Sequence, residues 1–212
     1  METSDNKKEG KEPIKIILLG DSGVGKTNII LRYLKDEFNQ NSISTIGTTF
    51  GVKELIRKNI TYNLNIWDTT GQEVYRSVTK LFIQGAKIVI LVYCIDQKKS
   101  FESLDYWYNS IMEICGENIV LGIVGNKMDL FDDEEKVEVT EEDGQKYANE
   151  KKAIFKLVSA KIDKKGIDSL FDQLFDKYIE ENIITNSEKK EKGNIVIVEQ
   201  KTSKKNKKKC CK

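Results

Sequence analysis

Residues 20–27 have the sequence Gly-Asp-Ser-Gly-Val-Gly-Lys-Thr (GDSGVGKT), and this stretch decides the fold. It fits the pattern G-x-x-x-x-G-K-[ST], in which glycines let backbone N–H groups converge on phosphate oxygens at the start of a helix. The apolar stretch 14–19 predicts a buried strand before it, and the helix-forming residues 28–37 predict a helix after it. The residues expected to contact phosphate are Ser22, Gly23, Val24, Gly25, Lys26, Thr27 and Asn28.

Two side chains at the end of this stretch have distinct expected roles. The Lys26 ammonium is placed to neutralise charge on the β- and γ-phosphates of a nucleotide. The Thr27 hydroxyl is a candidate ligand to Mg²⁺, a hard cation that prefers oxygen. The sequence therefore predicts a site for a nucleoside triphosphate with Mg²⁺.

Outward from this loop, strand and helix patterns alternate along the chain. Strands are predicted at 14–19, 49–58, 61–67, 87–95, 119–125 and 153–159, and helices at 28–37, at 100–115, from Thr140 and at 167–179. Thr140 with Asp143 is a weak relative of the capping box, which prefers Glu or Gln at the second position. Such alternation predicts an α/β fold: a mostly parallel, six-stranded sheet with helices on both faces.

A second polar motif, Asn126-Lys127-Met128-Asp129, follows the predicted strand 119–125. The carboxyl ends of parallel strands are where open α/β sheets bind ligands. A carboxylate at Asp129 can accept hydrogen bonds from both the N1–H and the 2-amino group of guanine, whereas adenine offers neither donor. Alone, these four residues are typical of a surface turn; beyond a phosphate-binding loop they predict a guanine site. The tripeptide Ser159-Ala160-Lys161, at the end of the next strand, is expected to support the same base.

The stretch Trp67-Asp-Thr-Thr-Gly-Gln-Glu73 ends another predicted strand. Asp68 is placed to bind Mg²⁺ through water, and the Gly71 N–H to contact a γ-phosphate. Gln72 is the candidate catalytic residue, because its amide can orient an attacking water. Thr45 lies in the loop between the first helix and the next strand. It is either an ordinary loop residue or a second hydroxyl ligand to Mg²⁺.

Five elements now stand in order: GDSGVGKT, Thr45, DTTGQ, NKMD and SAK. Together they resemble the Ras-superfamily small GTPases over about residues 14–181, and so imply a P-loop GTPase domain that binds GTP and GDP. The stretches at 46–50 (IGTTF), 63–67 (NLNIW) and 91–96 (LVYCID) are similar to segments typical of the Rab family.

The resemblance also implies roles for aromatic residues. Phe38 is expected to contact guanine edge-on. Ile46, Phe50, Trp67 and Phe82 are expected to form the effector surface, with the three aromatic residues as the group that Rab effectors recognise. The alternative for this group is ordinary core packing, and both interpretations are compatible with partial burial.

The chain departs from the family pattern at two informative positions. Thr70 stands where small GTPases usually have Ala, so a hydroxyl lies beside the expected γ-phosphate. This substitution motivates an alternative function, a GTP-binding scaffold with very slow hydrolysis. Cys94 replaces an Asp typical of Rab proteins and is expected to be a small buried residue. A third possibility, an ATP-using P-loop enzyme, is disfavoured by NKMD.

Composition excludes several other classes. The chain of 212 residues contains no histidine, so catalysis by His-containing triads and His-ligated zinc sites are excluded. The longest apolar run, 88–95, is too short to span a membrane. Four cysteines without CxxC spacing favour a reducing compartment over a disulfide framework.

The C-terminal stretch carries a separate signal. Residues 186–212 contain ten lysines and three glutamates, against a mildly acidic remainder. A polybasic run precedes Cys210 and Cys211, which resemble the double prenylation site of Rab proteins; a CaaX site is excluded because position 209 is Lys. The alternatives are a solvated tail with unmodified thiols, or nucleic-acid binding. The latter is disfavoured because no aromatic residues interleave with the lysines.

The predicted organisation is a flexible arm at 1–13, a small GTPase domain at 14–181 and a disordered basic tail at 182–212. The predicted function is a Rab-like GTP/GDP switch in vesicle trafficking. It hydrolyses GTP with Mg²⁺ and acts on the cytoplasmic face of an intracellular membrane, cycling with the cytosol. The expected partners are an exchange factor, a GTPase-activating protein, an escort protein or GDP-dissociation inhibitor, effectors and an anionic membrane surface. Nucleic acid is not among them.

Overall fold

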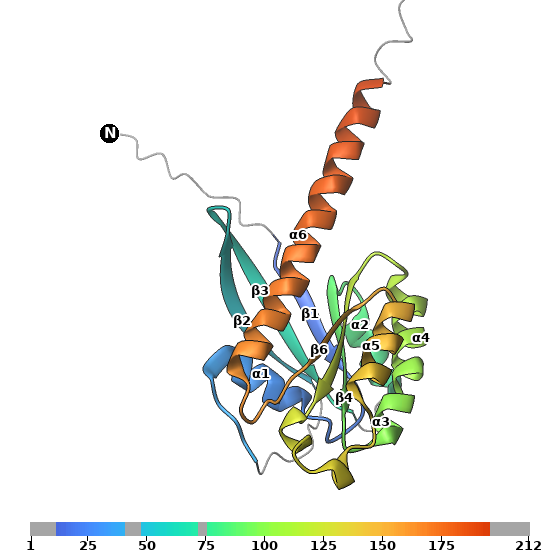
Figure 1. Cartoon of the computed structure of the whole chain (residues 1–212). Coiled ribbons are helices and arrows are strands. Elements are labelled where there is room, and N and C mark those ends of the chain that lie inside the picture. The colour runs from blue at the N-terminus through green and yellow to red at the C-terminus, as the bar shows by residue number, and fades with distance from the viewer. Residues whose placement is uncertain (1–11, 41–47, 72–75, 196–212) are drawn as a thin grey trace, which may run out of the picture. The chain divides into compact units, whose positions relative to one another are not determined.

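The computed structural model describes residues 12–40, 48–71 and 76–195, and its central feature is one six-stranded sheet (Figure 1). The strand order is β2-β3-β1-β4-β5-β6. The strands are β1 Ile14–Leu19, β2 Thr48–Arg57, β3 Ile60–Thr69, β4 Ile88–Cys94, β5 Val120–Asn126 and β6 Ile154–Leu157. All neighbouring pairs are parallel except β2 with β3. The predicted mostly parallel, six-stranded sheet is confirmed.

The antiparallel pair β2–β3 is joined by a two-residue turn. Lys58 and Asn59 both have positive φ angles, 51° and 61°, while Arg57 pairs directly with Ile60. Two successive residues with positive φ are the signature of a turn whose twist matches that of the adjoining strands. The turn is therefore Lys58-Asn59, so the first of these strands ends one residue before the predicted 58 and the second begins one residue before the predicted 61.

Helices cover both faces of the sheet (Figure 1). They are α1 Lys26–Lys35, α2 Arg76–Ile83, α3 Lys98–Glu102, α4 Leu104–Cys115, α5 Glu141–Glu150 and α6 Lys164–Ile195, with short 3₁₀ turns η2 Met128–Leu130 and η3 Glu134–Lys136. On one face, α1 meets α6 where the Tyr33 and Phe171 rings stack 3.8 Å apart. On the other, Trp107 of α4 is buried in a cluster with residues from α2, α5, β1 and β4.

The core explains why the apolar runs form strands. Every residue of β4 and β5 is buried, as expected for parallel strands with helices on both faces. The side chains of β1 alternate between the two faces of the sheet, and Ile17 and Leu19 pack on the face that carries the cluster around Trp107. Since β1 is central and ends at Leu19, it delivers the loop 20–25 to the middle of the sheet's carboxyl edge.

Two helical predictions differ in detail from the structure. The stretch 100–115 is divided into α3 and α4 at Ser103. At α5 the capping box is complete. The Thr140 hydroxyl accepts from the Asp143 N–H at 3.2 Å, and the Asp143 carboxylate accepts from the Thr140 N–H at 3.1 Å. A shorter Asp side chain therefore serves where Glu or Gln is usual.

The last helix is longer than the sequence predicts. Contacts divide the chain into a unit ending at Tyr178 and a second unit from Ile179, close to the predicted boundary at 181. The helix continues to Ile195, where unstructured chain was expected. Within this segment, the stretch 188–192 consists of Glu and Lys only, and both favour helix. Across the described part of the chain, no helix combines the length and apolarity needed to cross a membrane.

Candidate nucleotide-binding site

The loop after β1 requires glycine at positions of unusual backbone geometry. Gly25 has φ 97°, and a Cβ there would lie 2.2 Å from the Asn126 side-chain nitrogen. Only glycine adopts this conformation without strain and leaves room for the neighbouring amide. The loop turns directly into α1, so its N–H groups and the helix N-terminus converge on one place.

Lys26 is a buried cation at the start of α1. Its ammonium donates to the carbonyl oxygens of Gly20 at 2.8 Å and Asp21 at 2.9 Å, within the same loop. Burial lowers the pKa of Lys26 to about 8, although the carboxylates of Asp68 and Asp21 oppose the shift. A desolvated ammonium that is held by carbonyl oxygens of its own loop is well suited to receive an anionic ligand.

Thr27 and Asp68 bring two oxygen ligands together. The Thr27 hydroxyl donates to the Asp68 carboxylate at 2.8 Å, although the residues lie on α1 and β3. This donor set fits Mg²⁺, which prefers hydroxyl, carboxylate, water and phosphate oxygens. Within the described ranges, no group of three or more Cys, Asp or Glu is placed to bind a metal ion by itself. The residues thus fit a metal ion whose remaining ligands are phosphate and water.

Asn126, at the end of β5, connects the two ends of the site. Its amide donates to the Val24 carbonyl at 2.8 Å and accepts from the Ala160 N–H at 3.1 Å. The side chain is 2% exposed, so both hydrogen bonds are shielded from water. Asn126 therefore fixes the distance between the loop of residue 24 and the loop of residue 160.

The Asp129 carboxylate is oriented by the loop that follows β6. Ser159 donates its hydroxyl to Asp129 at 2.5 Å, and the Lys161 ammonium lies 3.8 Å from the second carboxylate oxygen. The same Ser159 oxygen accepts from the N–H groups of Lys161 and Ile162, at 3.2 and 3.3 Å. The SAK tripeptide thus forms a turn around one hydroxyl, which presents Asp129.

A cavity of roughly 340 Å³ brings the predicted residues together at the carboxyl edge of the sheet. Its lining comprises Ser22, Gly23, Gly25, Lys26, Thr27, Asn28, Phe38, Gln40, Thr69, Gly71, Asn126, Lys127, Asp129, Leu130, Ala160 and Lys161. Val24 and Ser159 contribute from just behind, through the hydrogen bonds described above. Loop residues from distant parts of the chain therefore surround one space. The residues predicted to contact phosphate, in the loop after β1, line one end, and the residues predicted to contact guanine, Lys127 and Asp129, line the other.

Comparison with known proteins identifies this arrangement. The Ras family profile matches residues 15–180. The Ras-related protein SEC4 of Candida albicans is 36% identical over 174 residues, which cover 80% of this chain and 81% of that protein. The Ras-related protein Rab-18 of Lymnaea stagnalis is 38% identical over 168 residues, covering 79% and 81%. The Ras-related protein RABA1b of Arabidopsis thaliana is 40% identical over 146 residues, covering 69% and 66%.

The chain belongs to the Ras family of small GTPases, in its Rab branch. It is a GTPase that binds GTP and GDP, and the prediction of a Rab-like switch in vesicle trafficking is confirmed. The alternative of a scaffold that scarcely hydrolyses GTP is not favoured by these relatives.

In this Rab-type GTPase, Lys127 has a partner that sequence analysis missed. Its φ is 69°, a left-handed conformation that is uncommon for lysine, and its ammonium lies 3.0 Å from both carboxylate oxygens of Asp96. Asp96 follows β4, at the same sheet edge as the other motifs. Its position directly after a buried strand was the signal that could have singled it out.

A second missed contact involves the Asn28 side chain. Its amide donates to the Asn39 carbonyl at 3.1 Å and accepts from the Asn39 N–H at 2.9 Å. The residue beside this pair, Phe38, is 36% exposed and lines the cavity. Asn28 therefore has a side-chain role in addition to the backbone contact predicted for it.

Gly71 brings the DTTGQ stretch against the phosphate loop. A Cβ at Gly71 would lie 2.3 Å from the Asp21 carbonyl carbon and 2.4 Å from the Ser22 nitrogen, so only glycine permits this approach. Thr70, the departure from the family pattern, is 4% exposed and hence buried next to it. Gln72, Thr45 and Ile46 lie outside the described residues, as do Cys210 and Cys211.

The three aromatic residues predicted for the effector surface contact one another. The ring centroids of Phe50 and Trp67 are 5.3 Å apart, and those of Trp67 and Phe82 are 5.9 Å apart. Phe50 is 59% exposed, whereas Trp67 and Phe82 are half-buried against the core cluster. The group thus combines core packing with an exposed apolar ring, which agrees with both interpretations of these residues.

Proposed function

We propose that the cavity binds GTP with Mg²⁺, its phosphates against the loop 20–25 and its guanine between Phe38, Lys127 and Asp129. The observation that carries the proposal is the pair of hydrogen bonds made by Asn126. They join the phosphate loop to the SAK loop and so place both recognition elements around one cavity. A bound nucleotide must span the distance from the phosphate loop to the base site, and a buried amide holds these two parts of the protein at a set distance.

Guanine selection is assigned to Asp129. Its carboxylate lines the cavity and is oriented by the Ser159 hydroxyl. An acceptor pair at this place matches the two donors on the guanine edge, whereas adenine offers the carboxylate neither of these donors. Sites built on such pairs reject the wrong ligand by about 10⁴-fold or more.

At the phosphate end, Lys26 and the loop N–H groups are assigned to the β- and γ-phosphates. Thr27 is the proposed direct ligand to Mg²⁺, and Asp68 acts through water. Thr45 is retained as a further hydroxyl ligand. A metal ion held by these residues would neutralise negative charge that develops on the phosphates during hydrolysis.

For hydrolysis, Gln72 is the proposed catalytic residue that orients the attacking water, and the Gly71 N–H contacts the γ-phosphate. Two of the three arginines in the chain are engaged elsewhere in the structure. Arg32 donates to the SAK loop, and Arg57 pairs with Asp172 and Asp176 of α6. This favours a GTPase-activating protein that supplies an arginine to the phosphates.

The exposed ring of Phe50, with Trp67, Phe82 and Ile46, is the proposed effector surface. GTP orders the loops around Thr45 and Gly71, and effectors recognise that order. An exchange factor returns the protein to the GTP-bound state. This assignment of partners rests on family membership and on the partly exposed aromatic group.

Membrane attachment is assigned to prenyl groups on Cys210 and Cys211, next to lysines that attract an anionic cytoplasmic leaflet. Two lipid chains, or one chain with a polybasic segment, anchor a protein stably, whereas a single chain does not. An escort protein or a GDP-dissociation inhibitor would shield such chains in the cytosol. The run at 195–198 is apolar and is a candidate contact for that carrier.

Single-turnover hydrolysis tests the catalytic part of this proposal. The full chain is loaded with GTP and GDP is measured with time, for the wild type and for Gln72→Leu. We expect slow intrinsic hydrolysis in the wild type and a clearly slower rate in the variant, with GTP binding unchanged in both. Equal rates would remove Gln72 from the mechanism. Failure of the wild type to retain GTP would contradict the proposed site itself.

A further inference from the structure

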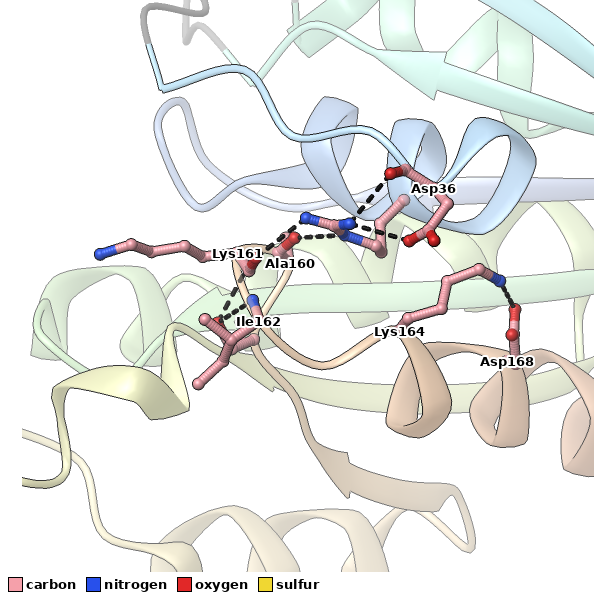
Figure 2. Close-up of polar contacts among 8 residues, drawn as sticks. Asp36, Ala160, Lys161, Ile162, Lys164 and Asp168 are labelled. Atoms are coloured by element: carbon pink, nitrogen blue, oxygen red, sulfur yellow. Dashed lines mark hydrogen bonds and ion pairs between the residues drawn. The ribbon is translucent and has the colours of Figure 1, made fainter.

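Arg32, in the middle of α1, makes an unusual set of contacts for a helix residue. Its side chain is 15% exposed. Nε donates to the Ala160 carbonyl and Nη2 to the Lys161 carbonyl, both at 2.9 Å. Nη1 donates to the Asp36 carbonyl at 3.0 Å and to the Asp36 carboxylate at 2.8 Å. Figure 2 shows Asp36 on one side of this network and Ala160 and Lys161 on the other.

The two segments that Arg32 joins are walls of the same cavity. Ala160 and Lys161 line it directly, and Phe38, two residues beyond Asp36, lines it from the other side. They are separated by more than one hundred residues in the chain. One guanidinium therefore links the SAK loop to the segment that carries Phe38, across the end of the cavity assigned to guanine.

Charge attraction does not explain this network. Asp36 is 61% exposed, and an ion pair with so exposed a carboxylate contributes little. Three of the four acceptors are instead backbone carbonyl oxygens. The planar guanidinium has five N–H donors in a fixed fork, so it binds several carbonyl oxygens at set angles. A lysine ammonium rotates freely and does not fix these angles. The contacts are therefore suited to fixing geometry.

Asp36 itself requires such support. It ends α1 in a left-handed conformation, φ 58°, and its N–H donates to the Arg32 carbonyl. A non-glycine residue in this region carries strain, which neighbouring contacts must offset. The Arg32 side chain bonds to both the backbone and the carboxylate of Asp36, and so stabilises the turn that leads to Phe38.

On the other side, the SAK loop connects Arg32 to base recognition. Ser159 binds Asp129 and also accepts the N–H groups of Lys161 and Ile162. The carbonyls of the two residues after Ser159 are those that Arg32 binds. A shift of this loop would therefore change how Ser159 presents the Asp129 carboxylate.

We infer that Arg32 is a positioning residue for guanine recognition: it keeps the two walls of the base end together and so sets the residence time of the nucleotide. The inference rests on the proposed function of the cavity. Without Arg32, the SAK loop and the segment of Phe38 lose their shared contact. The base is then held less tightly, and nucleotide leaves faster and with less discrimination between bases.

The test measures release of a fluorescent, ribose-labelled GDP from the full chain in excess Mg²⁺, for the wild type, Arg32→Ala, Arg32→Lys and Arg57→Ala. Arg57 is a matched control, because its guanidinium also makes several hydrogen bonds, but its partners Asp172 and Asp176 do not line the cavity, whereas Ala160 and Lys161 do. We expect release from Arg32→Ala to be at least about tenfold faster, the loss of two or more hydrogen bonds. Release from Arg57→Ala should stay within about twofold.

A second readout separates positioning from general destabilisation. Inosine diphosphate lacks the 2-amino group from which Asp129 is proposed to accept a hydrogen bond. Arg32→Ala should lower the preference for GDP over inosine diphosphate. In Arg32→Lys, neither the residence time of GDP nor this preference should return fully to the wild-type value, since lysine lacks the planar, forked guanidinium. Asp36→Ala, which removes one exposed acceptor and leaves alanine at φ 58°, is the second variant should Arg32→Ala fold poorly. It should speed release about twofold to fivefold.

Unchanged release and preference in Arg32→Ala would overturn the inference, as would equal acceleration in Arg57→Ala. If Arg32→Ala fails to fold, unchanged release in both Arg32→Lys and Asp36→Ala would overturn it. Failure of the wild type to prefer GDP over ADP would instead contradict the proposed function of the cavity. The two failures are therefore distinguishable in one set of measurements.

Discussion

The two ends of the cavity are constructed differently. At the base end, side chains bind one another: Ser159 binds Asp129, Asn126 binds the backbone of residue 160, and Arg32 joins the two walls. At the phosphate end, Lys26 is buried and donates to carbonyls of its own loop, and the Thr27 hydroxyl donates to the Asp68 carboxylate. The proposed base end is therefore held together by side chains from several segments, whereas the main feature of the proposed phosphate end is a desolvated positive charge suited to an anion. Selectivity and binding strength are thus separate properties of this site.

The largest effect is expected at the organised end. In Asp129→Asn, the remaining oxygen still accepts from Ser159, so the amide N–H₂ faces the base. Xanthine carries a 2-oxo acceptor where guanine has its 2-amino donor. The ratio of the dissociation constants for GDP and xanthosine diphosphate should therefore change by about 10⁴-fold.

Competition between the two diphosphates measures that ratio. Asp105→Asn serves as the control, because the Asp105 carboxylate binds Tyr147 and lies outside the cavity lining. An Asp129→Asn protein that keeps the preference of the wild type would show that base selection resides elsewhere, and the contrast between the two ends would lose its basis.

The sequence predicts the motif residues of the base end but not the contacts that support them. Asn126, Asp129 and Ser159 follow buried strands, and parallel strands bring their carboxyl ends to one edge. Arg32 belongs to none of the predicted motifs, and Asp96 lies in a stretch, 91–96, that was quoted only for its family resemblance and not for the site. Their partners lie 128 and 31 residues away in the chain, and an arginine on a helix ordinarily predicts only an exposed face. Such contacts depend on how α1 packs beside the last strand, which sequence periodicity does not specify.

The fold itself was predictable where periodicity is strong, and less so at its ends. Continuous β-branched runs predicted the buried strands β4 and β5 within about one residue. The break at Ser103 and the extension of α6 to Ile195 were missed. Helix boundaries depend on local caps and on small propensity differences, which a single sequence specifies poorly.

An intermediate effect is expected at the phosphate end, as a dependence on pH. Burial lowers the pKa of Lys26 from 10.5 to about 8, so the unfolded chain binds more protons than the nucleotide-free fold between these values. This group therefore makes the nucleotide-free fold more stable as pH rises through that window. A bound polyphosphate favours the charged ammonium and raises the pKa again. GDP binding should then take up a proton and weaken by at most about tenfold per pH unit above pH 8.

Calorimetry at about pH 8.5, in two buffers of different ionisation enthalpy, measures this proton uptake directly. Lys26→Met is the control, since it removes the ammonium that titrates. Any ionisation of the guanine ring of GDP contributes equally to the measurements on both proteins. Equal uptake in the wild type and in Lys26→Met would show that the charge of Lys26 is not what the phosphates meet. The proposed difference between the two ends would then be wrong.

The smallest effect is expected from Thr70, where the chain departs from its own family. Thr70 does not itself line the cavity, but it is buried beside Gly71, whose backbone packs against the phosphate loop, and we predict that its hydroxyl reaches the proposed γ-phosphate position. Such a hydroxyl competes with water as a phosphoryl acceptor, or with phosphate for a nearby N–H. Thr70→Ala should therefore raise intrinsic hydrolysis by about fivefold, the equivalent of one hydrogen bond of about 1 kcal/mol. It should leave GDP affinity unchanged, because the base end is not involved.

Single-turnover assays give the rate, and γ-labelled GTP shows whether any phosphate is transferred to the protein. Thr70→Ser, which keeps the hydroxyl, should behave like the wild type. If all three proteins hydrolyse GTP at one rate and none carries label, the hydroxyl has no part in the reaction, and the phosphate end of this GTPase functions as in relatives with alanine.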